Sequence, residues 1–175
     1  VTFQHEKVID RKEKVRATLV GGVAATMKAH KVTVVNAEAV IEGRTADGFA
    51  VAANGETYVG KRLVIATGSE AFVLPVPGAK EGLESGFVQT NREILSDKTL
   101  PRELVVIGGG GIGLEMACYY ASVGVKVTIV EMMPKIAGAT DPEICKILMD
   151  TYSRQGMIFK TGCKVLEIGR DCVYY

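Results

Sequence analysis

The sequence has little of what metal sites and nucleic-acid interfaces require. It contains no tryptophan and only two histidines and four cysteines, and no two cysteines form a Cys-x-x-Cys pair. This spacing predicts neither a metal site nor a redox disulfide, and favours small side chains packed inside a reduced protein. We expect such a protein in the cytoplasm, or in the mitochondrial matrix of a eukaryote. The 21 basic and 20 acidic residues leave a net charge of +1, so no nucleic-acid partner is expected.

The sequence also lacks a convincing membrane segment. The first ten residues carry mixed charges and have no apolar stretch of the kind found in signal peptides. Residues 104–125 hold a single charge, Glu115. A membrane span there would place this carboxylate near the bilayer centre, at a cost of about 2.5–3.5 kcal/mol. A strand, a glycine turn and a helix explain the same residues without that cost, so we expect no membrane association.

A long helix is predicted at the start of the chain, over residues 2–30. Its apolar residues recur at steps of seven and four and should form one face: Val8, Val15, Leu19, Val23 and Met27. The Gly21-Gly22 pair in its middle is unfavourable for a helix, which suggests that another element or a ligand approaches the backbone there.

Short β-rich runs follow the helix, at residues 31–35, 38–42, 48–53 and 56–59. Asn54-Gly55 supplies both positive-φ residues of a type I′ turn, so the last two runs should pair within a three-stranded antiparallel β-meander. The meander leads into Leu63-Val-Ile-Ala66, a continuous apolar run that is typical of a strand covered on both faces.

The second half of the chain alternates strands and helices, which predicts an α/β fold with a parallel sheet. The expected strands lie at residues 104–107, at 126–130, near 158 and at 164–168. Asp141 and Pro142 provide an N-cap and a first-turn proline for a helix that Gly156 ends. A short helix should begin at Thr90, which forms a capping box with Glu93.

The strongest motif is a glycine turn between the first strand and the first helix of this sheet. Gly108, Gly110 and Gly113 satisfy G-x-G-x-x-G, and Gly111 and Ile112 complete the turn. In a Rossmann-like βαβ unit, the first glycine allows the tight turn and the second lets a pyrophosphate approach the backbone. The third lets the helix pack closely on the strand, and the helix N-terminus offers N–H groups to phosphate. We therefore expect a dinucleotide-binding domain.

An acid follows the next strand, as the dinucleotide motif requires. Glu131 stands 18 positions after Gly113, where its carboxylate would accept hydrogen bonds from a ribose diol. The same charge would repel a 2′-phosphate, and Met132-Met133 offers no arginine to hold one, so the motif favours NAD(H) over NADP(H). Two alternatives stay open: a glycine turn without a ligand, and an S-adenosylmethionine methyltransferase that uses Gly109-x-Gly111-x-Gly113. Such a methyltransferase usually has an acid before the first glycine, and this chain has none there.

Glu115 has two interpretations. As an acid near the start of the helix, it would stabilise the positive end of the helix dipole. As a site residue, it would reach the nicotinamide end of a bound dinucleotide. Its position two residues after Gly113 leaves both open.

Several motifs resemble the flavoprotein disulfide reductases and, within them, the dihydrolipoamide dehydrogenases. In chain order they are Lys14–Gly22, Leu63-Val-Ile-Ala-Thr-Gly-Ser69, Leu74-Pro-Val-Pro-Gly78, Val105-Val-Ile-Gly-Gly-Gly-Gly-Ile-Gly-Leu-Glu-Met-Ala117, Asp141-Pro-Glu143 and Gln155-Gly-Met-Ile-Phe159. The sequence departs from the family at Val20, where the family has a threonine before two glycines. The resemblance covers essentially the whole chain.

The resemblance implies two incomplete domains. Residues 1–98 would be part of an FAD-binding domain that lacks its N-terminal βαβ unit, and residues 99–175 the first half of an NAD-binding domain. Ala66, Thr67 and Gly68 would pass beside the flavin nucleotide, and the backbone at Ala37 beside its adenine.

The same resemblance favours an NAD contact for Glu115 and implies the activity of the whole protein. Electrons would pass from a dithiol through a disulfide and FAD to NAD+, in a homodimer that serves a 2-oxoacid dehydrogenase or glycine cleavage complex. The family's FAD glycine motif, its Cys-x-x-x-x-Cys disulfide and its His-Glu pair do not occur in this sequence. We therefore expect a piece that binds NAD, does not retain FAD and contributes no catalytic residue.

Other functions remain as alternatives. NADH oxidases, mercuric reductases and coenzyme A disulfide reductases belong to the same superfamily and are separated by the cysteine segment that this sequence lacks. A free-standing NAD-binding module is an alternative of another class. The chain begins at Val1 without a methionine and ends at Tyr175 in a strand-like run, which favours an excised piece over the module.

Overall fold

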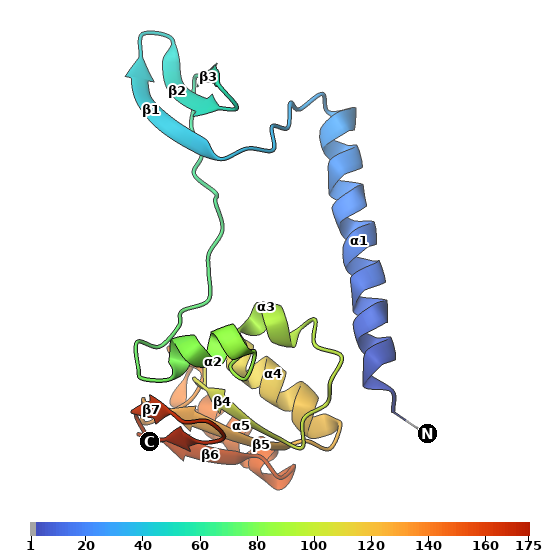
Figure 1. The fold of residues 1–175 in the computed structure, drawn as a ribbon, viewed down its shortest axis with the longest axis vertical. Helices are drawn as coiled ribbons and strands as arrows, with labels where there is room; N and C mark the ends of the chain where they lie inside the picture. The colour runs from blue at the N-terminus through green and yellow to red at the C-terminus, as the bar shows by residue number, and fades with distance from the viewer. Residues whose placement is uncertain (1–2) are drawn as a thin grey trace. The chain divides into compact units, whose positions relative to one another are not determined.

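The structure is a computed structural model that describes residues 3–175 (Figure 1). The chain forms two compact units, a larger one that contains the residues up to Arg11 together with Ala71–Tyr175, and a smaller one, Lys12–Glu70. Helix α1 (His5–Ala29) begins in the larger unit and continues into the smaller one. The predicted domain boundary between residues 98 and 99 describes cofactor domains rather than compact units, and it stays a prediction.

The smaller unit contains an antiparallel meander of β1 (Ala39–Thr45), β2 (Gly48–Ala53) and β3 (Glu56–Gly60). Asn54 and Gly55 have φ values of 52° and 78°, as a type I′ turn requires, and Ala53 pairs with Glu56 directly across it. The predicted hairpin and three-stranded meander are therefore confirmed.

Two other predicted strands of the smaller unit are wrong. Residues 31–35 and Leu63–Ala66 form no strand, and Val64 exposes 82% of its surface. A run of apolar residues becomes a strand only where its backbone groups find a ladder partner, and no described strand pairs with either run.

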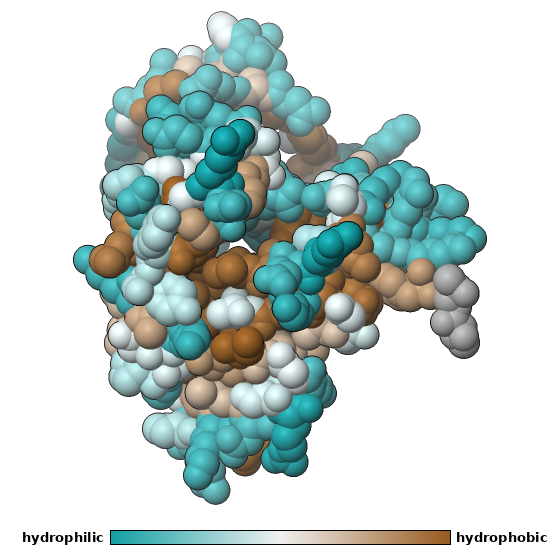
Figure 2. Space-filling model, turned by 60° about the horizontal axis from the view of Figure 1, so that its bottom comes forward, coloured by the Kyte–Doolittle hydropathy of each residue, from teal (hydrophilic) through white to brown (hydrophobic). Residues whose placement is uncertain are grey.

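Helix α1 is confirmed, but its apolar face is not covered. Val15, Leu19 and Val23 are exposed, Leu19 at 65%. No described element makes the close approach expected at Gly21-Gly22, because a Cβ added to either glycine would meet no atom within 4 Å. The approach of a ligand to these glycines stays a prediction. Figure 2 shows apolar residues, in brown, at the surface among hydrophilic ones. Among residues 3–175, no helix is long and apolar enough to cross a bilayer.

The larger unit is built on a parallel sheet in the order β4-β5-β6. These strands are β4 (Glu103–Ile107), β5 (Lys126–Glu131) and β6 (Ile158–Thr161), and they are connected by α4 (Gly111–Ser122) and α5 (Pro142–Arg154). Asp141 caps α5 by accepting the N–H of Glu143 at 2.8 Å. The predicted α/β fold, with its parallel sheet and separate antiparallel meander, is confirmed.

The parallel sheet packs on both faces, because neighbouring residues of its central strand point in opposite directions. Ile129 is fully buried in a core with α4 and α5, through residues such as Ala117 and Cys145. Val130, on the other face, packs with Ala79 and Ile168. Those two residues belong to α2 (Ala79–Ser85) and to β7 (Glu167–Ile168), which pairs with β8 (Val173–Tyr174).

Helix α2 was not expected from the sequence, and the predicted strand at 164–168 shortens to β7. Gly78 caps α2 with φ 78°, and a Cβ there would stand 1.8 Å from the carbonyl oxygen of Ile168. The N–H of Ile168 also donates to Pro77 at 2.9 Å. Glycine is therefore required where the start of α2 meets β7.

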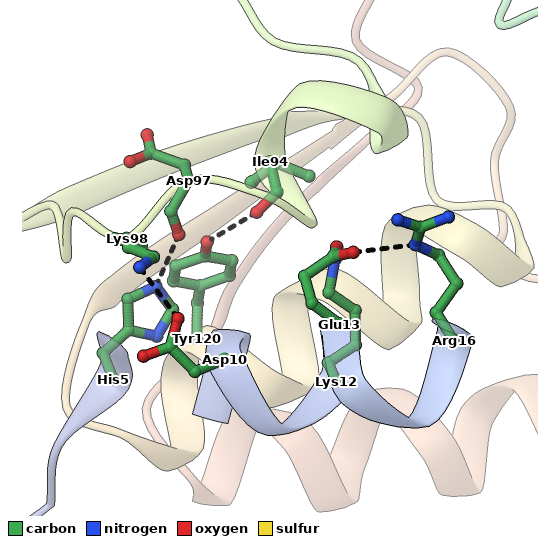
Figure 3. A network of polar contacts seen from close by, with 9 residues as sticks. All are labelled: His5, Asp10, Lys12, Glu13, Arg16, Ile94, Asp97, Lys98 and Tyr120. Atoms are coloured by element: carbon green, nitrogen blue, oxygen red, sulfur yellow. Dashed lines mark hydrogen bonds and ion pairs between the residues drawn. The ribbon is translucent and has the colours of Figure 1, made fainter. Parts of the chain in front are cut away.

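A polar network attaches the first turns of α1 to the larger unit (Figure 3). His5 is buried, and its Nε2 lies 3.0 Å from the carbonyl oxygen of Asp97 while its Nδ1 lies 2.8 Å from the hydroxyl of Tyr119. A neutral ring that donates from Nε2 and accepts at Nδ1 satisfies both contacts. Lys98 adds an exposed ion pair with Asp10 at 2.8 Å.

The short helix α3 (Asn91–Ile94) stands beside this network, and Figure 3 shows Tyr120 donating its hydroxyl to the carbonyl of Ile94. Its predicted capping box is confirmed, since the N–H of Thr90 donates to Glu93 at 2.7 Å. A hydrogen bond from the Thr90 hydroxyl, together with the one from its N–H, holds the pKa of the Glu93 carboxyl below its ordinary value.

Candidate dinucleotide-binding site

The glycine turn lies at the carboxyl end of β4, where α4 begins. Gly108 has φ 102°, a conformation that side chains disfavour, and its N–H donates to Val130 on the neighbouring strand at 2.8 Å. Gly110 is the N-cap of α4 in an extended conformation, and no side chain caps the helix. The first N–H groups of α4 therefore have no side-chain acceptor, which is the arrangement that binds phosphate at helix N-termini.

The turn is crowded on one side and open on the other. A Cβ added to Gly113 would stand 2.2 Å from the carbonyl oxygen of Gly108 and 3.2 Å from Val106, so only glycine lets α4 pack this close to β4. A Cβ added to Gly110 or Gly111 would meet no atom within 4 Å. These are the steric roles that the motif gives its glycines, and they leave room over the turn for a pyrophosphate.

Glu131 connects the end of β5 to the glycine turn. Its Oε2 accepts the N–H of Gly109 at 2.7 Å, and its Oε1 accepts the N–H of Met133 at 2.6 Å. Each carboxylate oxygen can accept more than one hydrogen bond, so both keep capacity for ribose hydroxyls. The structure thus places the predicted acid beside the predicted turn.

The other two residues predicted for the NAD site, Ile112 and Glu115, lie on α4. Ile112 is exposed on the first turn of α4. Glu115 is exposed and is the fifth residue of α4, whose first turn contains no acid. The interpretation of Glu115 as a first-turn stabiliser is therefore wrong, because the helix begins at Gly111, and its role as an NAD contact stays a prediction.

The residues predicted for FAD lie in the smaller unit. Ala66, Thr67 and Gly68 are exposed in an irregular segment, where Gly68 has φ 84°. Ala37 is half-buried in the connection that precedes β1. Their relation to a flavin stays a prediction.

One part of the site was not expected from the sequence. The loop between β5 and α5 returns to the glycine turn, where the N–H of Ala137 donates to the carbonyl oxygen of Gly109 at 2.8 Å. Ala137 has φ 60°, and an alanine gives no signal for a conformation that favours glycine or asparagine. The fully buried side chain of Ile136 also packs against Gly109.

The four cysteines are free and differ in their surroundings. Cys145 is buried and its thiol donates to the carbonyl of Ile136 at 3.2 Å, as expected of a small core side chain. Cys118 and Cys163 are half-buried, but Cys172 is exposed, which the sequence did not predict. Within residues 3–175, no three His, Cys, Asp or Glu side chains gather as metal ligands would.

Comparison with known proteins identifies the family to which this arrangement belongs. The family described as pyridine nucleotide-disulphide oxidoreductase matches residues 3–173. The chain belongs to this family. Membership confirms the resemblance carried by the sequence motifs and decides against a methyltransferase.

Two dihydrolipoyl dehydrogenases are similar to the chain along its whole length. The chain is 39% identical over 175 residues to a dihydrolipoyl dehydrogenase of Acholeplasma laidlawii, with all of this chain and 51% of that protein covered. It is 34% identical over 175 residues to a dihydrolipoyl dehydrogenase of Mycoplasma pneumoniae, with 37% of that protein covered. The chain thus spans about half, or less, of the length of these relatives.

Two solved structures share the fold of this chain. LpdA from Mycobacterium tuberculosis has a TM-score of 0.79 at 18% identity, over 97% of this chain and 38% of that one. The flavoprotein disulfide reductase RclA from Escherichia coli, as a Cu(II) complex, has a TM-score of 0.76 at 24% identity, over 95% of this chain and 38% of that one. At these identities the likeness establishes the fold alone.

Proposed function

We propose that this chain carries the NAD(H) site of a dihydrolipoamide dehydrogenase-like flavoprotein. The observation that supports the proposal is the hydrogen bond from Gly109 to Glu131, which joins the open glycine turn to the acid at the carboxyl ends of adjacent parallel strands. In open α/β sheets, ligands bind at these strand ends. The names of the relatives support the choice of dihydrolipoamide over other substrates.

The residues present suit the two halves of an adenine dinucleotide. The uncapped N–H groups at the start of α4 and the open space beside Gly110 and Gly111 suit a pyrophosphate. The Glu131 carboxylate suits the ribose diol and repels a 2′-phosphate, which favours NAD(H). Glu115, which is exposed further along α4, would contact the cofactor toward its nicotinamide end. A bound nicotinamide supplies a hydride acceptor.

The smaller unit would contribute to a flavin site in the whole protein. Ala66, Thr67 and Gly68 are all exposed and would lie beside the flavin nucleotide. Ala37 would lie beside the adenine of the same cofactor. In that protein, dithiol electrons would reach NAD+ through a disulfide and FAD. We expect the present chain alone to lack the activity and to retain no FAD, because the sequence contains neither the redox cysteine pair nor the FAD glycine motif.

The proposal extends to partners of the whole protein. We expect a homodimer that serves a 2-oxoacid dehydrogenase or glycine cleavage complex, in the cytoplasm. These expectations come from the similarity to the dihydrolipoyl dehydrogenases.

The test compares the binding of NADH with that of NADPH in titrations that are monitored by the fluorescence of the nucleotide. The unaltered chain should bind NADH more tightly than NADPH. Glu131→Gln removes the charge and should raise the Kd for NADH about 10- to 100-fold, because hydrogen bonds to a charged group contribute about 1.5–3 kcal/mol. The preference over NADPH should shrink at the same time.

Glu143→Gln is the matched control, because Glu143 is an exposed acid of the same unit. It should leave both titrations unchanged. Equal NADH and NADPH curves for the unaltered chain, or no response to Glu131→Gln, would remove Glu131 from the proposed role.

A further inference from the structure

The Gly109 peptide is held from two directions by residues 131–140. Its N–H donates to Oε2 of Glu131 at 2.7 Å, and its carbonyl oxygen accepts the N–H of Ala137 at 2.8 Å. Gly109 is itself buried, and a Cβ there would stand 3.0 Å from Ile136. The orientation of this peptide is therefore set by the loop that follows β5.

The loop holds Ala137 in a conformation that alanine disfavours. A left-handed φ of 60° is unfavourable for any residue with a Cβ, so the surrounding contacts must maintain it. On one side, the buried Ile136 is fixed in the core. On the other, the N–H of Thr140 donates to the carbonyl of Ala137 at 3.1 Å.

Lys135 ties the far side of this loop together. Its ammonium donates to the carbonyl oxygens of Gly138 and Thr140, the latter at 2.8 Å, and lies 3.9 Å from the Sγ of Cys145. All three donors of the ammonium thus face groups of the loop or of α5. The Lys135 side chain is half-buried, while Gly138 and Thr140 are exposed.

We propose that Lys135 is a positioning residue of the dinucleotide site: by holding the left-handed turn at Ala137, it sets the orientation of the Gly109 peptide. The inference rests on the proposed function. Lys135 acts through Ala137, since its side chain contacts Gly138, Thr140 and Cys145 and not the glycine turn. Its role differs from that of Glu131, because it bears on the turn that NADH and NADPH share and not on the 2′ position.

The first test removes the charge and keeps most of the stem, in Lys135→Met. Amide hydrogen exchange of the peptide that contains Ala137, measured without added nucleotide, should become faster. The Kd values for NADH and NADPH should rise together by about tenfold, the equivalent of ~1.4 kcal/mol, with their ratio unchanged. Lys146→Met is the matched control, because Lys146 is exposed on α5, and it should change neither quantity.

A second variant separates positioning from general loss of stability. Ala137→Gly removes the Cβ that disfavours the left-handed conformation. It keeps the N–H that donates to the carbonyl oxygen of Gly109. The double variant Lys135→Met/Ala137→Gly should therefore bind NADH more tightly than Lys135→Met alone. A purely structural role for Lys135 would lower the free energy of unfolding but leave the Kd of the folded protein for NADH unchanged in both variants.

Each outcome decides one of the two proposals. Absence of NADH binding by the unaltered chain would overturn the proposed function and, with it, the positioning role. If the unaltered chain binds NADH and Lys135→Met leaves affinity and exchange at Ala137 unchanged, the positioning role alone is overturned. Failure of Ala137→Gly to rescue the affinity would overturn it too.

Discussion

The two units of this chain contain similar apolar runs with opposite fates. Leu104–Ile107 lies in β4 and pairs in parallel with β5, whereas Leu63–Ala66 pairs with no described strand and leaves Val64 and Ile65 exposed. The difference lies in the surroundings, because β4 pairs with β5 and packs against the core formed with α4 and α5, whereas no described strand pairs with Leu63–Ala66. Hydrophobicity selects the residues of a buried strand, but the ladder partner decides whether a strand forms.

The largest expected effect would come from removing core volume in the larger unit. Ile129→Ala deletes part of a fully buried side chain and should lower the free energy of unfolding by about 2–5 kcal/mol. The matched change in the smaller unit, Ile65→Ala, removes an exposed side chain and should change it by less than about 0.5 kcal/mol. Urea unfolding followed by circular dichroism measures both, and equal losses would show that the smaller unit also buries its apolar run.

Replacing one glycine in each unit by alanine should change the stability in opposite directions. Gly113→Ala would place a Cβ 2.2 Å from the carbonyl of Gly108, and we expect a loss of about 3 kcal/mol together with weaker NADH binding. Gly21→Ala places its Cβ in open space inside α1 and should stabilise that helix by about 1 kcal/mol. Thermal melts of the two variants check the signs. A destabilising Gly21→Ala would reveal the close approach that the sequence first suggested.

The smallest effect concerns the two histidines. His5→Ala removes buried contacts with Tyr119 and the carbonyl of Asp97, and should cost about 1–2 kcal/mol of unfolding free energy. His30→Ala, just beyond α1 in the smaller unit, changes an exposed side chain and should have no measurable effect. Guanidinium unfolding compares the two. Similar values would mean that the contacts of His5 do not hold the start of α1 to the larger unit.

The parts of the fold that the sequence predicted are those with local chemical signals. Asn54-Gly55 identified the hairpin, Thr90 and Glu93 the capping box, and Asp141 the start of α5. Each of these signals is satisfied by residues within a few positions along the chain. Local signals therefore predict structure without information about distant contacts.

The parts that were missed depend on contacts between distant residues. The strand expected at Leu63–Ala66 required a partner that no local pattern reveals. The start of helix α2 depends on the close contact of Gly78 with Ile168, about ninety positions later in the chain. The contact of Ala137 with Gly109 depends on a left-handed backbone conformation that an alanine in the sequence does not predict. In the candidate site, the sequence identified Gly108, Gly113 and Glu131 but not the loop that contacts Gly109.

The attachment of Gly109 to Glu131 and Ala137 bears on how fast a nucleotide would bind and leave. A turn already fixed by protein groups loses little conformational entropy when a ligand arrives, so encounter and not loop ordering should limit association. Differences between related nucleotides would then appear mainly in their residence times on the protein. The hydrogen bonds that hold the Gly109 peptide would therefore influence how fast the cofactor exchanges.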